Sequence, residues 1–324
     1  MQYSGTEIVF VSLHLRRNLI IYFHTAIICS TYYFMNKPSG LKHWSDEDAE
    51  SSFDKDANEA IVLIDPDFIF MKKFDVNITA TPGSPAGAYY GLGEQWLGFN
   101  LTRICGADSL CAKTTQKMAK DKGLSTGPPY IIHSADVNRL ATRWKELVPP
   151  IYEEYPLLYA EMFAYSAAAA DLDLPHTLSH DLFTGCMVSW PRNSDIKTVQ
   201  PVAERFINSF DSGSIDDVLL PDQGVKSCFS EDLGQPPLLH FCKRYTWHLN
   251  NGTQLAMAKR RIPHDTVDCD HDDALLPWQD EDKFVSPKGL KRNKEELWNS
   301  LAVCAIIRGV AFAKKQGCKI EKTS

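Results

Sequence analysis

The sequence predicts an α/β protein, because short apolar strands alternate with amphipathic helices along it. Residues 61–64 form a run of β-branched and aliphatic side chains, which is typical of a strand buried on both faces. Residues 136–147 carry apolar side chains at helical spacing, at Val137, Leu140, Trp144 and Leu147. Further short apolar runs predict additional strands, at residues 86–90, 130–133 and 238–241.

The composition is that of an ordinary globular protein and excludes some classes of function. The chain has 324 residues, 44% of them hydrophobic, which suffices for one large domain or two small ones. The net charge is −7 and no long basic tract occurs, which argues against nucleic-acid binding. Nine dispersed cysteines contain no Cys-x-x-Cys pair, so a zinc ribbon is disfavoured. Sequons at Asn77, Asn100 and Asn251, together with the cysteines, favour the ER or Golgi lumen.

The first 35 residues allow two interpretations. Arg16 and Arg17 precede an apolar stretch at residues 19–35, as they would before a membrane anchor. That stretch is shorter than the roughly 20 apolar residues that span a bilayer, and it carries polar side chains without a clear cleavage site. The other interpretation is a strand at residues 8–13, followed by a buried helix or strand.

The next elements follow from local signals. Residues 38–40, Pro-Ser-Gly, predict a turn into a short helix, and the acidic tract at residues 45–59 predicts a solvated helix end and loop. The strand that ends at Asp65 continues after a turn as residues 68–71. Cys105 and Cys111 are close enough in the chain to close a small disulfide loop.

The middle of the chain predicts two helices. Asp136 is expected to cap the first one, and the pair Pro149-Pro150 is expected to stop it. Pro156 stands at the expected first position of the second helix, at residues 157–170. A turn and strand follow at residues 175–181.

The last part of the chain predicts fewer elements. Residues 189–234 are rich in Asp, Ser, Pro and Gly, and predict an irregular segment with one helix at residues 202–210. Asn293 and Glu296 predict a capping box at the start of a final helix, and Gly317 is its expected end.

Two acidic residues directly follow the strand at residues 61–64. In open α/β sheets, ligands bind beyond the carboxyl ends of the strands, so Asp65 and Asp67 can hold a Mg²⁺ or Mn²⁺ ion that in turn holds a diphosphate. This is the Asp-x-Asp arrangement of nucleotide-sugar glycosyltransferases. The alternative is a polar turn that only caps the strand.

Two other polar residues stand in apolar surroundings. Glu161 lies among apolar residues at helical spacing, namely Leu157, Leu158, Tyr165 and Ala168. A carboxylate there is unfavourable unless it is paired or faces a cavity, so an ion pair with an arginine is the structural alternative to a catalytic role. His240, in the strand at residues 238–241, is either a metal ligand or a hydrogen-bonded core residue.

These segments, in this order, resemble the plant and algal peptidyl serine α-galactosyltransferases and the related hydroxyproline O-arabinosyltransferases. The resemblance covers residues 36–317. Its segments are Asn36-Lys37-Pro38-Ser39-Gly40 with His43-Trp44, Asp65-Pro66-Asp67, residues 86–91 and 127–129, Glu161-Met162-Phe163-Ala164-Tyr165, His176 with Asp181, residues 237–240, and Asp268-Cys269 with the helix around residues 298–317.

The resemblance implies a GT-A-like fold, a mixed sheet flanked by helices, formed by residues 36–324 as a single domain. It implies a UDP-sugar donor, with galactose or arabinose as the sugar. It also implies Mn²⁺, or Mg²⁺, as cofactor and a Ser- and hydroxyproline-rich protein as acceptor in the secretory pathway.

The resemblance also implies roles for particular residues. Asp65, Asp67 and His240 would hold the cation. Asn36, Lys37, His43, Trp44 and Asp65 would line the nucleotide side, and Lys243, next to Arg244, would reach a phosphate. Glu161 and Asp181 would be the catalytic carboxylates, with Glu161 acting as nucleophile or stabilising an oxocarbenium-like state.

The chain departs from the family in its short N-terminal part. Family members carry a longer segment before the Asn-Lys-Pro motif, and that segment seats the nucleotide base. Either residues 1–35 supply a first strand, or the nucleotide-binding half is incomplete. In the second case the chain would be a non-catalytic, degenerate transferase of the secretory pathway that binds a glycan or a protein.

Overall fold

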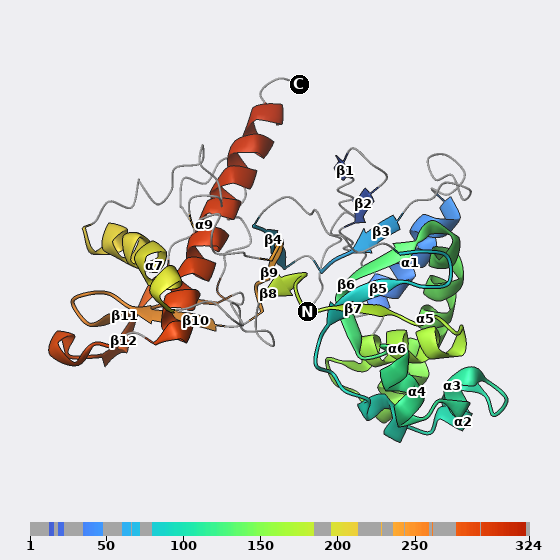
Figure 1. Cartoon of the computed structure of the whole chain (residues 1–324). Helices are drawn as coiled ribbons and strands as arrows, with labels where there is room; N and C mark the ends of the chain where they lie inside the picture. The colour runs from blue at the N-terminus through green and yellow to red at the C-terminus, as the bar shows by residue number, and fades with distance from the viewer. Residues whose placement is uncertain are drawn as a thin grey trace, which may run out of the picture. The chain divides into compact units, whose positions relative to one another are not determined.

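We describe a computed structural model of the chain (Figure 1). The residues it describes are 13–15, 19–22, 35–47, 60–65, 67–71, 80–184, 196–212, 228, 236–242, 244–258, 261, 277–291 and 293–321. The chain divides into two compact units, and it passes three times between them. The first unit comprises Met1–Pro66 and Val76–Leu182, and the second comprises Asp67–Asp75 and Phe183–Ser324. Helices and mixed sheets occur in the protein, as the α/β prediction requires.

The first unit contains a six-stranded mixed sheet in the order β1-β2-β3-β6-β5-β7. Its strands are β1 (Leu13–Leu15), β2 (Leu19–Tyr22), β3 (Ala60–Leu63), β5 (Ala86–Tyr89), β6 (Thr126–His133) and β7 (Thr177–Ser179). β2 and β3 are parallel, as are β5 and β7, whereas β6 runs antiparallel to both β3 and β5. The carboxyl ends of β2, β3, β5 and β7 therefore lie along one edge of the sheet.

The N-terminal segment contributes two strands to this sheet. β2 pairs with β3 in parallel, and β1 pairs with β2 in the antiparallel sense. The predicted strand at residues 8–13 lies outside the described residues except for Leu13, where β1 begins. Within the described parts of the chain, no helix combines the length and the apolar character needed to cross a membrane.

The buried strand that ends in the acidic pair is confirmed, since the side chains of Ile61, Val62 and Leu63 are at most 1% exposed. β6 is longer than predicted and includes Pro128 and Pro129. Prolines lack the N–H that a central strand uses for pairing. They are accommodated because the β5–β6 register shifts between Gly87 and Ala88, so that neither proline has a partner residue on β5.

Helices α1 (Asn36–Glu47), α5 (Ser134–Glu154) and α6 (Ala160–Asp171) flank the sheet, and α5 packs against both of the others (Figure 1). Between β5 and β6 lie the short helices η3 (Gln95–Gly98), α2 (Leu101–Cys105), α3 (Leu110–Lys113) and α4 (Gln116–Asp121). Residues 38–40, predicted as a turn, lie inside the first turns of α1. Proline is tolerated there because the first turn of a helix has no partner for its N–H groups.

The predicted start and end of α5 are wrong. His133, not Asp136, is the N-cap, and its Nδ1 accepts from the Ala135 N–H at 3.1 Å. Asp136 instead accepts from the Gly83 N–H at 2.7 Å, which ties a distant turn to the helix. Pro149 and Pro150 lie within α5, which runs on to Glu154. The carbonyls that lose a donor belong to residues 145 and 146, which are exposed to water.

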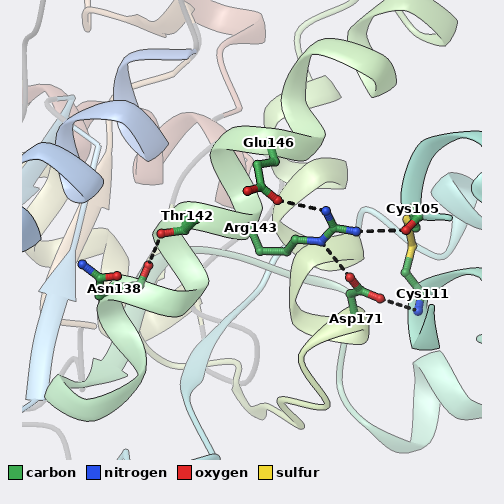
Figure 2. Close-up of polar contacts among 7 residues, drawn as sticks. All are labelled: Cys105, Cys111, Asn138, Thr142, Arg143, Glu146 and Asp171. Atoms are coloured by element: carbon green, nitrogen blue, oxygen red, sulfur yellow. Dashed lines mark hydrogen bonds and ion pairs between the residues drawn. A yellow bond between two sulfur atoms is a disulfide. The ribbon is translucent and has the colours of Figure 1, made fainter. Parts of the chain in front are cut away.

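A network around Arg143 joins α5 to α6 and to the confirmed disulfide between Cys105 and Cys111 (Figure 2). Arg143 Nε lies 2.7 Å from Asp171 Oδ2 at the end of α6, and Nη1 lies 2.9 Å from Glu146 Oε2. Its Nη2 donates to the Cys105 carbonyl at 3.0 Å, while the Cys111 N–H donates to Asp171 at 3.2 Å. These bonds hold the disulfide loop on the α5–α6 pair.

The second unit contains two three-stranded sheets, in the orders β4-β9-β8 and β10-β11-β12. Their strands are β4 (Phe68–Phe70), β8 (Phe183–Thr184), β9 (Leu238–His240), β10 (Arg244–His248), β11 (Thr253–Ala258) and β12 (Trp278–Phe284). Its helices are α7 (Ile196–Asp211), α9 (Lys294–Glu321) and η7 (Pro287–Gly289). A disulfide between Cys228 and Cys304, which was not predicted, fixes α9 within this unit.

The predictions for α9 are partly confirmed. Asn293 Oδ1 accepts from the Glu296 N–H at 2.9 Å, which is one half of the capping box. The Glu296 carboxylate instead accepts from the His248 N–H at 2.7 Å. Gly317 does not end the helix, which continues to Glu321.

Candidate functional site

In the first unit, three charged side chains meet where the predicted acidic strand ends. Lys37 Nζ lies 2.8 Å from Asp65 Oδ1 and 3.0 Å from Glu161 Oε2. We call Lys37, Asp65 and Glu161 the buried charge cluster, since the exposed fractions of their side chains are 15%, 19% and 2%. Glu161 is thus ion-paired, as the structural alternative expected, but its partner is a lysine rather than an arginine.

Each member of the cluster comes from a different element. Lys37 is in the first turn of α1, Asp65 follows the carboxyl end of β3, and Glu161 is in the first turn of α6. α6 begins at Ala160 rather than at residue 157, and Leu157 and Leu158 are exposed before it. From Ala160 to Ala170 every side chain of α6 is buried. The helix therefore fixes the Glu161 carboxylate in a buried position at the edge of the sheet.

Burial and mutual charge shift the pKa values within the cluster. Burial raises the pKa of Glu161 to about 7; the Lys37 ammonium opposes this rise and the Asp65 carboxylate adds to it. Burial alone would lower the pKa of Lys37, but Asp65 and then Glu161 outweigh it and raise that pKa above its ordinary value. Lys37 thus stays charged, and Glu161 can exchange a proton near neutral pH.

Aromatic packing holds Glu161 in place. Trp144 Nε1 on α5 donates to the Glu161 backbone carbonyl at 2.9 Å. The Tyr130 and Tyr165 rings stack with centroids 3.9 Å apart, and the Trp144 ring meets the Tyr165 ring edge-on at 5.0 Å. These fully buried rings connect β6, α5 and α6 beneath the cluster.

In the second unit, a carboxylate and an imidazole meet across 173 residues of sequence. Asp67 Oδ2 lies 3.2 Å from His240 Nε2, and each side chain is 12% exposed. β4 and β9 produce this contact, because Phe68 stands opposite His240 in their antiparallel register and the Phe241 N–H donates to the Asp67 carbonyl at 2.8 Å. The His240 ring stacks on the Phe68 ring, with centroids 4.6 Å apart.

The donor atoms of this pair suit a divalent cation. Two ligand atoms that each lie about 2.1 Å from an octahedral ion, at a right angle, are roughly 3 Å apart. The separation between Asp67 Oδ2 and His240 Nε2 matches that value. Carboxylate oxygen suits Mg²⁺ and Mn²⁺, and imidazole nitrogen suits Zn²⁺ and other transition metals. The pair can equally stand as a direct hydrogen bond.

The remaining predicted residues lie elsewhere or outside the description. His43 is exposed on α1, and Trp44 is 3% exposed within the core, so Trp44 cannot present its ring to a ligand. Asp181 is exposed in the loop after β7, where its N–H donates to Ser179 Oγ at 3.2 Å. Asp65 follows β3 and Asp181 follows β7. Three strand spacings, on the order of 14 Å, separate the ends of these two strands. The Asn36 side chain and Lys243 lie outside the described residues.

Sequence reasoning missed the role of His176. Its Nδ1 lies 2.9 Å from the Leu174 carbonyl, so Nδ1 carries the proton and Nε2 accepts from the Tyr165 hydroxyl at 2.8 Å. Burial lowers the pKa of His176 to about 4, which keeps the ring neutral. Tyr165 lies within α6 and His176 lies after its end, 11 residues further on. No local sequence pattern therefore predicts their hydrogen bond.

No protein-family model, no curated protein and no solved structure matches the chain.

Proposed function

We propose that the protein transfers a sugar from a UDP-sugar to a Ser or hydroxyproline hydroxyl of a protein acceptor, with a divalent cation and a GT-A-like fold. The observation that carries this proposal is the contact between Asp67 Oδ2 and His240 Nε2 at 3.2 Å. The two residues are far apart in sequence, and Asp67 follows shortly after the strand β3. The mixed sheet with β6 antiparallel among parallel strands also supports it. The family resemblance supplies the donor, the acceptor and the secretory location.

Asp67 and His240 would hold the cation, which we take to be Mn²⁺, together with Asp65. Asp65 and Asp67 are separated by one residue, so their Cα atoms lie within about 7 Å of each other in any backbone conformation. When bound, the cation neutralises the charge that develops on the departing diphosphate, an effect of several kcal/mol. Lys37 would add a second positive charge near Asp65.

Glu161 is the residue to which we assign the chemistry at the sugar. If the reaction retains configuration, its carboxylate would attack the anomeric carbon as UDP leaves. The acceptor oxygen would then displace the carboxylate, and the acceptor hydroxyl would pass its proton to the diphosphate of the departed UDP. If no covalent intermediate forms, the same charge stabilises the oxocarbenium-like state. We place Asp181 as a second carboxylate on the same edge of the sheet, where it would serve the acceptor side.

Substitution of Asp67 and His240 tests the proposal directly. D67N and H240Q should each raise the Kd for Mn²⁺ at least about tenfold, since each removes one ligand. They should lower transfer to a Ser/hydroxyproline peptide on the order of 10²-fold, about 2.7 kcal/mol. Calorimetric titration with MnCl₂ measures the first effect, and the mass shift of the peptide measures the second.

The second unit offers a matched control. His248 Nδ1 lies 2.8 Å from Glu296 Oε1, so this pair has the same chemistry as the Asp67–His240 pair. H248Q should leave Mn²⁺ binding and transfer unchanged. The proposed role would be contradicted if H248Q and H240Q lost Mn²⁺ binding and transfer equally. It would also be contradicted if D67N transferred sugar as fast as the wild type.

The second candidate function is a degenerate, non-catalytic glycan- or protein-binding protein. The ion pair between Lys37 and Asp65 favours it, because an ammonium already neutralises that carboxylate. A thermal shift assay separates the two candidates. Stabilisation by UDP plus Mn²⁺ supports the transferase, and no shift at millimolar ligand supports the binding protein.

A further inference from the structure

One ammonium group serves two carboxylates in the buried charge cluster. Lys37 Nζ contacts Asp65 at 2.8 Å and Glu161 at 3.0 Å, and no more than 19% of any of these side chains is exposed. Little water is therefore available to screen their charges, and charges at this depth interact more strongly than on the surface. Any second cation that approaches Asp65 will meet the positive charge of Lys37.

We propose that Lys37 competes with the divalent cation for Asp65 and so sets the cation affinity of the proposed site. When the cation binds Asp65, the Lys37 ammonium stays paired with Glu161. This inference rests on the proposed function, because it takes Asp65 as a cation ligand. It goes further in giving Lys37 and Glu161 a shared role as residues that tune cation binding.

The geometry allows this exchange with little movement. A lysine has a flexible four-carbon stem and three rotatable donors. The Glu161 carboxylate is already within 3.0 Å, so Lys37 keeps a carboxylate partner when it releases Asp65. The α6 helix holds Glu161 in a fixed, buried position, so the receiving carboxylate does not move away.

The position of Lys37 on its helix supports the same conclusion. Lys37 lies in the first turn of α1, at the positive end of the helix dipole, where a cation is disfavoured. The two carboxylates are what hold it there. When a divalent cation takes Asp65, the ammonium keeps Glu161 as its carboxylate partner among the described residues.

Variants that change the charge of the cluster test the proposal. With all three groups ionised, the cluster carries one net negative charge. K37Q leaves two negative charges and no competing ammonium, so the Kd for Mn²⁺ should fall at least about tenfold. E161Q removes one of the two carboxylates that pair with the ammonium among the described residues and leaves Asp65. The Kd for Mn²⁺ should therefore rise about tenfold. K37R keeps the charge and should bind Mn²⁺ as the wild type does.

The measurement is a titration of the full chain with MnCl₂ at pH 8, followed by electron paramagnetic resonance of free Mn²⁺. K42Q is the matched control, because Lys42 lies on the same helix and pairs with Asp46 instead. K42Q removes the same charge and should leave the Kd unchanged. If K37Q does not fold, E161Q still tests the proposal, since it leaves a neutral Lys37–Asp65 pair.

The outcomes separate this inference from the proposed function. Tighter binding in K37Q with weaker binding in E161Q supports the inference. If D67N weakens Mn²⁺ binding but K37Q does not strengthen it, the inference is overturned and the proposed cation site stands. If wild type, D67N and K37Q all bind Mn²⁺ alike, or not at all, both are overturned.

Discussion

Glu161 and His176 are both buried in the first unit, yet burial moves their pKa values in opposite directions. Burial favours the neutral form of each group, which raises the pKa of Glu161 from 4.5 to about 7 and lowers that of His176 from 6.5 to about 4. Between pH 4.5 and 7 the folded chain keeps a proton on Glu161 that the unfolded chain has lost, so the free energy of unfolding falls as pH rises. Between pH 6.5 and 4 the unfolded chain gains a proton on His176 that the folded chain excludes, so that free energy falls as pH falls.

These opposing contributions should be separable by substitution. Each is worth roughly 3 kcal/mol across its window. Relative to metal-free wild type, the free energy of unfolding of E161Q should rise by roughly 3 kcal/mol from pH 4.5 to 7, because the destabilising contribution of Glu161 is gone. Relative to wild type, that of H176Q should fall by a similar amount from pH 4 to 6.5. Urea denaturation at a series of pH values measures both, and parallel curves for all three proteins would refute the assignment.

At the scale of elements, the hydrogen bond from Trp144 on α5 positions the start of α6. W144F removes the donor to the Glu161 carbonyl together with part of a fully buried side chain. W96F is a matched control, because Trp96 is also fully buried and its Nε1 has no hydrogen-bond partner within the described part of the structure. W144F should therefore destabilise the protein by about 1 kcal/mol more than W96F. Thermal and urea denaturation would measure the difference, and equal losses would show that this bond does not stabilise α6.

The two disulfides should differ in their contribution to stability, because they close loops of very different length. The bond between Cys228 and Cys304 spans a separation of 76 residues, and that between Cys105 and Cys111 spans 6. Loop-closure entropy predicts a loss of about 4.5 kcal/mol in C228A/C304A and about 2.2 kcal/mol in C105A/C111A. Hydrogen exchange should show the loss in the second unit for the first pair and in the first unit for the second pair. Comparable losses for both pairs would contradict the entropic ranking.

At the scale of the whole molecule, the proposed function predicts that ligand and cation stabilise the protein together. UDP plus Mn²⁺ at about 100 times the Kd should raise the free energy of unfolding by about 2.7 kcal/mol. Chelation with EDTA should remove this effect, because UDP without the cation would lack the contact to Asp67 and His240. A thermal shift assay with UDP, Mn²⁺ and EDTA in all combinations checks this. Full stabilisation by UDP in the presence of EDTA would exclude a cation-dependent donor site.

A donor screen addresses the chemistry itself. Transfer to a Ser/hydroxyproline peptide should add either a hexose or a pentose, and the mass of the product distinguishes them. D67N, with its strongly reduced transfer, serves as the control in the same assay. A product that forms equally with D67N would mean that transfer does not use the proposed cation site.

Local signals in the sequence were sufficient for a large part of the fold. The strand at residues 61–64 was predictable because a short run of β-branched and aliphatic side chains is typical of a strand covered on both faces. The disulfide between Cys105 and Cys111 was predictable because the cysteines are six residues apart. The Asn293 cap was predictable because capping depends on residues within one helical turn.

The same local signals failed where distant residues competed with them. Asp136 has the chemistry of a helix cap, but the Gly83 N–H, 53 residues away, takes its carboxylate. Pro149 and Pro150 should end α5, but the exposed carbonyls of the preceding turn can bond to water instead. Residues 157 and 158 have helical spacing with Glu161, yet α6 starts only after them.

By itself, the sequence determined the α/β class, the buried strand and the acidic pair after it, since these depend on side chains that are neighbours along the chain. Only the tertiary structure decided that Lys37 joins Asp65 and Glu161, and that Asp67 and His240, paired before only through the family resemblance, are in direct contact. Such contacts depend on which strands pair and in which register, and a shift of one residue in β9 would turn His240 to the other face of its sheet. No pattern within a short stretch of sequence records that register, because it is set by the packing of the whole unit.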